Sequence, residues 1–285
     1  MDKGVLVIHL GGLGDVCLSE STFYSLRLYF GHRLEAVGYT RFLGLFAEHF
    51  QTVCSVEERR WLWLFSDAAS PPEPWDHIVL VGKDAAGEMR RRLQALTAAP
   101  LVFIDAYPDA EQVHVEEYQL RQLAHQGITP LRKEPPPRES GRVILYPERS
   151  YRKAKWPIES FLELHARLAG QGIPAEIMEP HDLPPAIPGA CRFGELADVK
   201  TYLSKGGIFV SNDCGIAHVA GACGLSSLTL FHDFEPAVWH PRGGCHAVRC
   251  DKSWPSVEEV SALIRGALSN GSPIPTNPEP WVLKS

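Results

Sequence analysis

The stretch that decides the fold is IFVSNDCGIAHVAGAC, residues 208–223. Its first four residues form a short apolar run after two glycines, which predicts a buried strand. Residues 212–215 are a polar turn, and the small apolar residues 216–223 predict a helix packed closely against a sheet. A strand, a turn and a helix start in this order are typical of an anion site, because the first backbone N–H groups of a helix have no partner within it.

Three residues of this stretch are candidate ligand contacts. Gly215 lets a ligand approach the backbone closely, and His218 follows within the first helical turn, where it can face the same ligand. Asp213 either accepts hydrogen bonds from a ribose or caps the helix. The local pattern alone favours a simpler interpretation, a capped helix with a histidine in the core.

A second strand, turn and helix open the chain. Residues 4–10 are a continuous apolar run, residues 11–15 are a glycine-rich turn, and residues 16–30 have helical spacing. The turn lacks the G-x-G-x-x-G spacing of a dinucleotide site. Asp15 lies between the end of the strand and the start of the helix, at the sheet edge where ligands of open α/β sheets bind. It is a candidate general base for a substrate hydroxyl, or it caps the helix.

The rest of the chain alternates strands with helices and predicts an α/β fold of two Rossmann-like β/α/β domains. We expect domains at 1–130 and 142–270, joined by a proline-rich linker at 131–141 and followed by an irregular tail at 271–285. Their carboxyl sheet edges would face each other across a cleft, with Asp15 on one side and residues 213–218 on the other. Residues 59–65 fit a strand or a surface helix equally well. Further strands are expected at 34–37, 52–56, 77–82, 101–104, 142–146, 173–178, 227–231 and 247–250, and helices at 41–50, 87–95, 113–126, 157–170, 199–204 and 257–268.

Composition excludes several classes of protein. The 285 residues are 45% hydrophobic and 22% charged with a net charge of −6, which indicates a soluble globular protein without the basic field that recruits nucleic acid. No stretch is long and apolar enough to span a membrane, and no signal peptide is visible. The seven cysteines are scattered without a C-x-x-C pair, which favours a reducing cytoplasm.

Two clusters of chemistry-bearing residues are weaker candidates. Cys245 and Cys250, with His240 and His246 nearby, match no zinc spacing, so no metal is expected. The arginines at 90–92 read as a solvated helix face, or else as a contact for an anionic acceptor.

Three motifs together resemble glycosyltransferase family 9, the bacterial ADP-heptose:lipopolysaccharide heptosyltransferases. Residues 5–15 resemble the first strand and L-G-D turn of the family, and residues 144–161, with Lys155-Trp156-Pro157, resemble the segment that opens its second domain. Residues 211–220 resemble its N-D-S-G-x-x-H-x-A motif, and residues 230–241 resemble the continuation of that motif.

The resemblance implies a GT-B fold and an inverting, metal-independent glycosyltransferase. Asp15 would be the general base. The donor, a nucleotide-sugar such as ADP-heptose, would be held by Lys153, Lys155, Asp213, Cys214, Gly215 and His218. The acceptor would be a lipopolysaccharide or another cell-envelope glycan, reached in the cytoplasm or by peripheral contact with the inner membrane. No other cofactor and no nucleic acid partner is implied.

The sequence also departs from the family pattern. Ala154 stands where the family usually has a phosphate-binding lysine, Cys214 where it has serine or threonine, and Ser21 where it has proline. These changes leave two alternatives open: a non-catalytic relative that binds a nucleotide, and another GT-B-type enzyme such as a nucleotide-sugar epimerase. Glu179 and His181 follow a strand at the same sheet edge and are further candidates for donor contact.

Overall fold

The computed structural model of the protein describes residues 4–66, 71, 74–136, 141–149, 154–180, 182–250, 253–270 and 281–282. The chain divides into two compact units, Met1–Lys133 and Glu134–Ser285. They are called the N-terminal and C-terminal units below, and each is described by itself.

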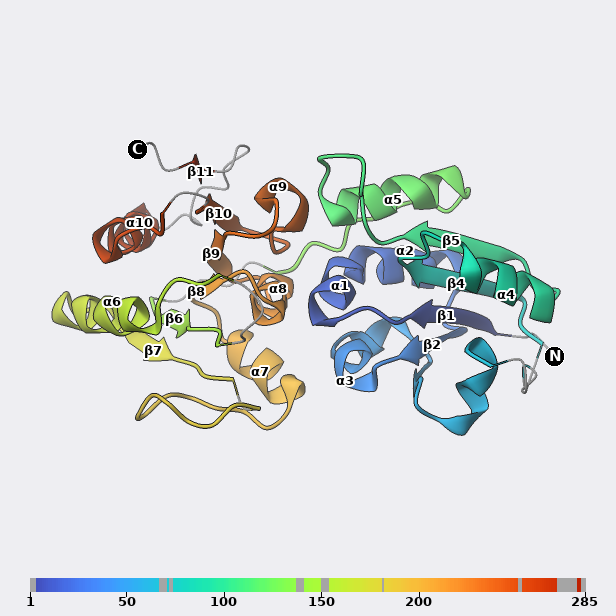
Figure 1. The fold of residues 1–285 in the computed structure, drawn as a ribbon, viewed down its shortest axis with the longest axis horizontal. Helices are drawn as coiled ribbons and strands as arrows, with labels where there is room; N and C mark the ends of the chain where they lie inside the picture. The colour runs from blue at the N-terminus through green and yellow to red at the C-terminus, as the bar shows by residue number, and fades with distance from the viewer. Residues whose placement is uncertain are drawn as a thin grey trace. The chain divides into compact units, whose positions relative to one another are not determined.

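The centre of the N-terminal unit is β1, Val5–His9, whose five residues are all buried. A run without polar alternation is typical of a strand covered on both faces. In the described residues a five-stranded parallel sheet has the order β3-β2-β1-β4-β5 (Figure 1). The order reverses between β1 and β4, and ligands of such sheets bind at the carboxyl ends of the strands at that reversal. The other strands are β2, Leu34–Gly38; β3, Thr52–Ser55; β4, His77–Gly82; and β5, Leu101–Asp105.

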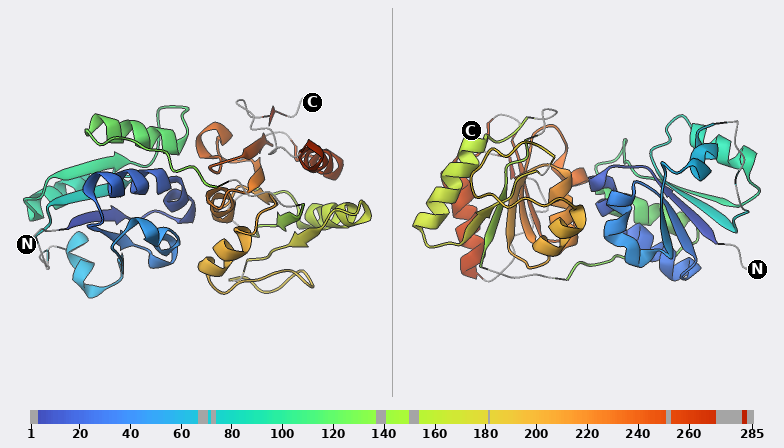
Figure 2. Two further views of the ribbon diagram at one scale, coloured as in Figure 1. Left: turned by 180° about the vertical axis from the view of Figure 1, so that it is seen from behind. Right: turned by 90° about the horizontal axis from the view of Figure 1, so that it is seen from below.

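The C-terminal unit repeats this plan. The described strands form a parallel sheet of order β11-β10-β9-β8-β6-β7, and its order reverses between β6 and β8. Helices α6 and α10 cover one face, and α7 and α8 the other (Figure 2). The strands are β6, Val143–Tyr146; β7, Ala175–Ile177; β8, Ile208–Asn212; β9, Ser226–Phe231; β10, Cys245–Arg249; and β11, Trp281–Val282. The helices are α6, Ile158–Gly170; α7, Leu196–Leu203; α8, Gly215–Ala222; α9, Pro236–Trp239; and α10, Val257–Asn270.

Two helices predicted as continuous are broken in the structure. The helix expected at 16–30 is α1, Leu13–Leu18, followed by α2, Glu20–Phe30. Ser19 separates them, and its hydroxyl donates to the backbone carbonyl of Asp15 at 2.8 Å, a local bond that competes with helix continuation. The helix expected at 41–50 is a single turn, α3, Thr40–Leu43, followed by the 3₁₀ helix η1, Gly44–His49. The remaining helices of this unit are α4, Glu88–Leu96, and α5, Val115–His125.

The segment that sequence patterns left undecided, 59–65, is mostly the 3₁₀ helix η2, Arg59–Leu64. Its two tryptophans, Trp61 and Trp63, are fully buried against β1 and β4 residues such as Leu6 and Ile78. Burial of large aromatic area, rather than backbone propensity, holds this segment to the sheet. The tail expected to be irregular includes β11, which pairs in parallel with β10.

Candidate functional site

Asp15 lies in the first turn of α1, directly after β1 and beside the point where the strand order reverses. The backbone N–H of Gly12 donates to its carboxylate Oδ2 at 2.8 Å. Asp15 therefore does take part in capping its own helix. The capping bond also fixes the direction of the carboxylate at the carboxyl edge of β1.

The protonation of Asp15 is set by opposing effects. Burial raises its pKa, because a buried carboxylate loses hydration, while the Gly12 N–H and a hydrogen bond with the Tyr107 side chain lower it. The net pKa lies above the ordinary value for aspartate. Tyr107 follows β5 at the same edge of the sheet, and sequence reasoning missed it, since residues 15 and 107 share no motif.

A buried histidine forms hydrogen bonds with the turn between β1 and α1 and with the residue that follows α1. His9, the last residue of β1, accepts the Gly11 N–H at Nδ1 over 3.3 Å, and its Nε2 lies 3.2 Å from the Ser19 hydroxyl. Burial lowers the pKa of His9 to about 4, so the ring is neutral at neutral pH. The Nδ1 atom accepts a proton donor, so the ring hydrogen is on Nε2, and Nε2 donates to Ser19. Ser19 in turn donates to the Asp15 carbonyl.

Gly11 is required by close packing in this turn. A Cβ atom at Gly11 would lie 2.8 Å from the Asp15 Cβ and 2.8 Å from Cε1 of His9. A Cβ at Gly12 would meet only the Asp15 carboxylate, at 3.6 Å. The glycine-rich turn thus lets the backbone pass between two functional side chains.

Ser21, where the family that the sequence resembles has proline, makes internal bonds. Its hydroxyl donates to the buried Glu116 at 2.5 Å and accepts the Lys133 N–H at 2.9 Å. Glu116 is also paired with Arg132 at 2.8 Å. This departure from the family pattern therefore stabilises the end of the N-terminal unit.

In the C-terminal unit the carboxyl ends of β6, β8 and β9 come together. Asn212 is buried at the end of β8, and its Oδ1 accepts the Trp156 N–H at 2.9 Å. The Asp213 N–H donates to the Leu230 carbonyl at 2.9 Å. These bonds hold the segment before α6 and the turn before α8 at one edge of the sheet.

Asp213 and Cys214 lie in the turn before α8, Gly215 is the first residue of the helix, and all three are half-buried. The residue at the N-cap of α8 is Cys214, so Asp213 does not cap this helix. Burial raises the pKa of the Cys214 thiol to about 12, although the nearby N–H groups of Ala217 and Ile216 act in the opposite direction. The thiol is therefore uncharged beside the helix start.

His218, on the first turn of α8, is buried with 6% of its surface exposed. The burial fits the simpler expectation of a histidine in the core. Contact between its ring and a ligand stays a prediction.

Lys155 is held by an acidic neighbour. Its Nζ lies 2.5 Å from Glu148 Oε2, and both side chains are mostly buried. The N–H of Ala154, the position where the family that the sequence resembles has lysine, donates to Asp233 at 3.2 Å. Lys153 and His181 lie outside the described residues. Glu148 and Asp233 were not expected as partners, although they lie within segments 144–161 and 230–241, because the resemblance of those segments singles out neither residue.

The weaker candidates have structural partners. Glu179 is buried and accepts the Ala186 N–H at 3.0 Å. The arginines of α4 bond within their own unit: Arg90 to Asp84, Arg91 to the Ala86 carbonyl, and Arg92 to the Trp63 carbonyl. The thiols of Cys245 and Cys250 lie near Thr229 and the Val248 carbonyl, and among the described residues no metal-binding group includes them.

The two parallel sheets and their helices define the GT-B fold of glycosyltransferases, which confirms the predicted fold class. Solved structures with a similar fold include heptosyltransferases and a family 9 glycosyl transferase. The heptosyltransferase WaaC of E. coli, solved with ADP, has a TM-score of 0.68 and 17% identity over 92% of this chain and 99% of its own. A family 9 glycosyl transferase from Veillonella parvula has a TM-score of 0.71 and 14% identity, covering 94% and 97%.

The ADP-heptose lipopolysaccharide heptosyltransferase II of E. coli has a TM-score of 0.65 and 14% identity, covering 94% of this chain and 99% of its own. No protein-family model matches the chain, and no curated protein sequence matches it. At these identities the structural likeness establishes the fold. No helix in the described part of the chain is long and apolar enough to cross a membrane.

Proposed function

We propose that the protein is an inverting glycosyltransferase that moves a sugar from a nucleotide-sugar to a cell-envelope glycan. The donor that we propose is ADP-heptose. The observation that carries the proposal is the Asp15 carboxylate, oriented by the Gly12 N–H and the Tyr107 side chain at the reversal point of a parallel sheet. A carboxylate fixed at that edge supports the proposed role of general base.

In the proposed reaction Asp15 takes the proton of the acceptor hydroxyl. The acceptor oxygen then forms a bond to the anomeric carbon of the donor, while the bond from that carbon to the diphosphate oxygen breaks. The electron pair leaves with the nucleoside diphosphate, and the configuration at the anomeric carbon inverts. The raised pKa of Asp15 makes the carboxylate a stronger base than an exposed aspartate.

The C-terminal unit would hold the donor. The helix start at Gly215 offers backbone N–H groups to the diphosphate, and Asp213 offers acceptor oxygens to the ribose. Lys153 and Lys155 are proposed to face the phosphates, together with Cys214 and His218 around them. The neighbour WaaC was solved with ADP and, in a second structure, with ADP-2-deoxy-2-fluoro heptose, which supports an adenosine diphosphate donor for this chain.

One observation favours a second candidate, a non-catalytic protein that binds a nucleotide. Lys155 is already ion-paired with Glu148, so its charge is less available to a leaving diphosphate. In this alternative the nucleotide binds to the C-terminal unit, but no sugar is transferred.

Titration calorimetry and a turnover assay separate the two candidates. We expect wild-type protein to bind ADP in preference to UDP and to release ADP from ADP-heptose when a glycan acceptor is present. Asp15→Asn should lower turnover by about 10²–10⁴-fold while ADP affinity stays within about twofold. A matched control is Asp76→Asn, at the amino end of β4, which should behave as wild type. Binding without turnover in the wild type would support the nucleotide-binding alternative, and no binding of any nucleotide would contradict both.

A further inference from the structure

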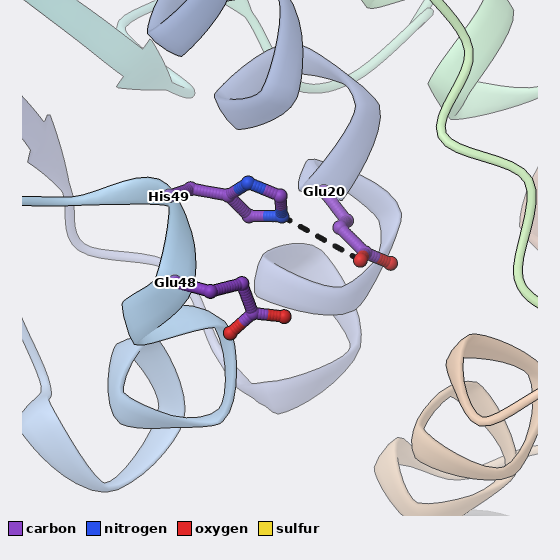
Figure 3. Close-up of side chains that lie close together, drawn as sticks. All are labelled: Glu20, Glu48 and His49. Atoms are coloured by element: carbon purple, nitrogen blue, oxygen red, sulfur yellow. Dashed lines mark ion pairs between the residues drawn. The ribbon is translucent and has the colours of Figure 1, made fainter. Parts of the chain in front are cut away.

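A group of two carboxylates and one imidazole lies between α2 and η1 of the N-terminal unit (Figure 3). Glu20 is the first residue of α2, and Glu48 and His49 are the last two residues of η1. One ligand atom from each side chain lies within 4.8 Å of the others. Glu20 and His49 are buried, while Glu48 is exposed.

His49 is the unusual member of this group. Its side chain is 1% exposed, and neither ring nitrogen has a hydrogen-bond partner among the described residues. The Nε2 atom faces Glu20 Oε1 at 3.6 Å, which is too long for a hydrogen bond. The ring of Tyr24 packs edge-on against the imidazole of His49, and this ring contact supplies no hydrogen bond to the imidazole. Figure 3 marks the contact between His49 and Glu20 as an ion pair, but a buried imidazole whose nitrogens make no hydrogen bond is costly, and a ligand that satisfies them would recover that cost.

The spacing of the three side chains suits a cation. Zinc bound to nitrogen and carboxylate oxygen at about 2.1 Å has ligand atoms roughly 3.4 Å apart around a tetrahedron. The distance of 3.6 Å between His49 and Glu20 already matches this value. The Glu48 side chain is exposed, and one of its carboxylate oxygens lies within 4.8 Å of the ligand atoms of the other two side chains.

We propose that Glu20, Glu48 and His49 bind one divalent first-row transition metal ion of the Zn²⁺ class. One imidazole nitrogen and two carboxylates are a donor set that such ions accept. The ion would offset the repulsion between the two carboxylates and would join η1 to the start of α2. Its role is structural, since none of its ligands is a residue of the proposed transfer reaction. The inference does not depend on the proposed function.

The test uses full-length protein freed of metal with a chelator, which is then removed. We expect calorimetric titration with ZnCl₂ to show one site per chain, and Zn²⁺ to raise the midpoint of thermal unfolding. Glu48→Gln keeps the shape of an exposed side chain and removes a ligand charge, so it should weaken this Zn²⁺ site at least tenfold. Glu57→Gln changes an exposed glutamate of the same unit outside the group and should leave it unchanged.

Cobalt distinguishes this site from the cysteines. Co²⁺ at the proposed site should give visible bands of nitrogen and oxygen ligation without the near-ultraviolet charge transfer of a thiolate, and Glu48→Gln should remove those bands. The proposal is overturned if wild-type protein binds no stoichiometric metal ion, if Glu48→Gln and wild type bind it equally, or if the cobalt spectrum shows thiolate ligation. Circular dichroism of Glu48→Gln verifies that lost binding is not lost folding.

Discussion

At the scale of single residues, the chemistry of the N-terminal unit depends on how Asp15 and His9 respond to burial. Burial raises the pKa of Asp15 and lowers the pKa of His9 to about 4. Both shifts disfavour the charged form, because a buried charge loses hydration. The hydrogen-bond partners of Asp15 and His9 then determine the size of each pKa shift.

Tyr107→Phe removes the phenol that hydrogen bonds to Asp15. The phenol lowers the pKa of Asp15, so the variant carboxyl should have a still higher pKa. A hydrogen bond to a charged group contributes about 1.5–3 kcal/mol, which corresponds to a rise of roughly 1–2 pH units. The acid limb of the kcat/KM profile should move to higher pH by this amount, with a smaller effect on turnover well above the pKa. A uniform loss of activity at every pH would contradict a role through the protonation of Asp15.

The low pKa of His9 makes stability depend on pH. The folded state holds His9 with a pKa of about 4, below the ordinary value of 6.5, so the unfolded state binds more protons between these values. Stability from this residue is therefore complete above pH 6.5 and is lost as the pH falls toward 4. Between pH 7 and pH 5 wild type should lose about 2 kcal/mol more than His9→Gln. Urea unfolding at the two pH values measures the difference, and equal losses would contradict the prediction.

At the scale of elements, most strands were predictable and several helix boundaries were not. Apolar runs such as residues 4–10 are interpretable from sequence because both faces of a parallel strand are buried. The breaks at Ser19 and Gly44 depend on bonds and packing within the folded unit, and helical periodicity does not reveal them. In the same way, the Asp15 turn and the turn before α8 were found by motif. Tyr107 was missed because its role arises from a contact with the distant Asp15, and Glu148 was missed because its pairing with Lys155 depends on the folded path of the segment between them.

The turn between β1 and α1 offers a matched pair of substitutions. Gly11→Ala would place a Cβ 2.8 Å from the Asp15 Cβ, which must then shift, so we expect about 1–3 kcal/mol lower stability and a large loss of turnover. Gly12→Ala meets the carboxylate only at 3.6 Å and should be tolerated. Urea unfolding and the transfer assay measure both effects. Equal behaviour of the two variants would show that the close packing at Gly11 does not control Asp15.

At the scale of the whole molecule, the chain has two units with separate cores. One buried cluster surrounds Trp61 and Trp63 in the N-terminal unit, and another joins α6 and α10 to β6, β8 and β9 in the C-terminal unit. Each unit also has its own reversal of strand order, and the residues of the proposed reaction lie beside these reversals. We therefore propose one ligand site in each unit, for the acceptor in the N-terminal unit and for the nucleotide-sugar donor in the C-terminal unit.

Hydrogen exchange with and without ADP tests this division. Ordering of backbone N–H groups around a diphosphate should slow exchange at residues 213–218 and at 154–157. The turn at 11–15 should change much less with ADP alone. Protection centred on residues 11–15, with none at 213–218, would contradict the assignment of the nucleotide to the C-terminal unit.

The condition of the thiols has a practical consequence for spectroscopy. Five of the seven free cysteines are buried, and Cys214, half-buried, has a pKa raised to about 12, so its reactive thiolate is scarce near neutral pH. A fluorophore or spin label can therefore be attached at a newly introduced surface cysteine without first deleting the native ones. Cys191, which is half-buried, is the background site to check by mass spectrometry of the labelled wild type.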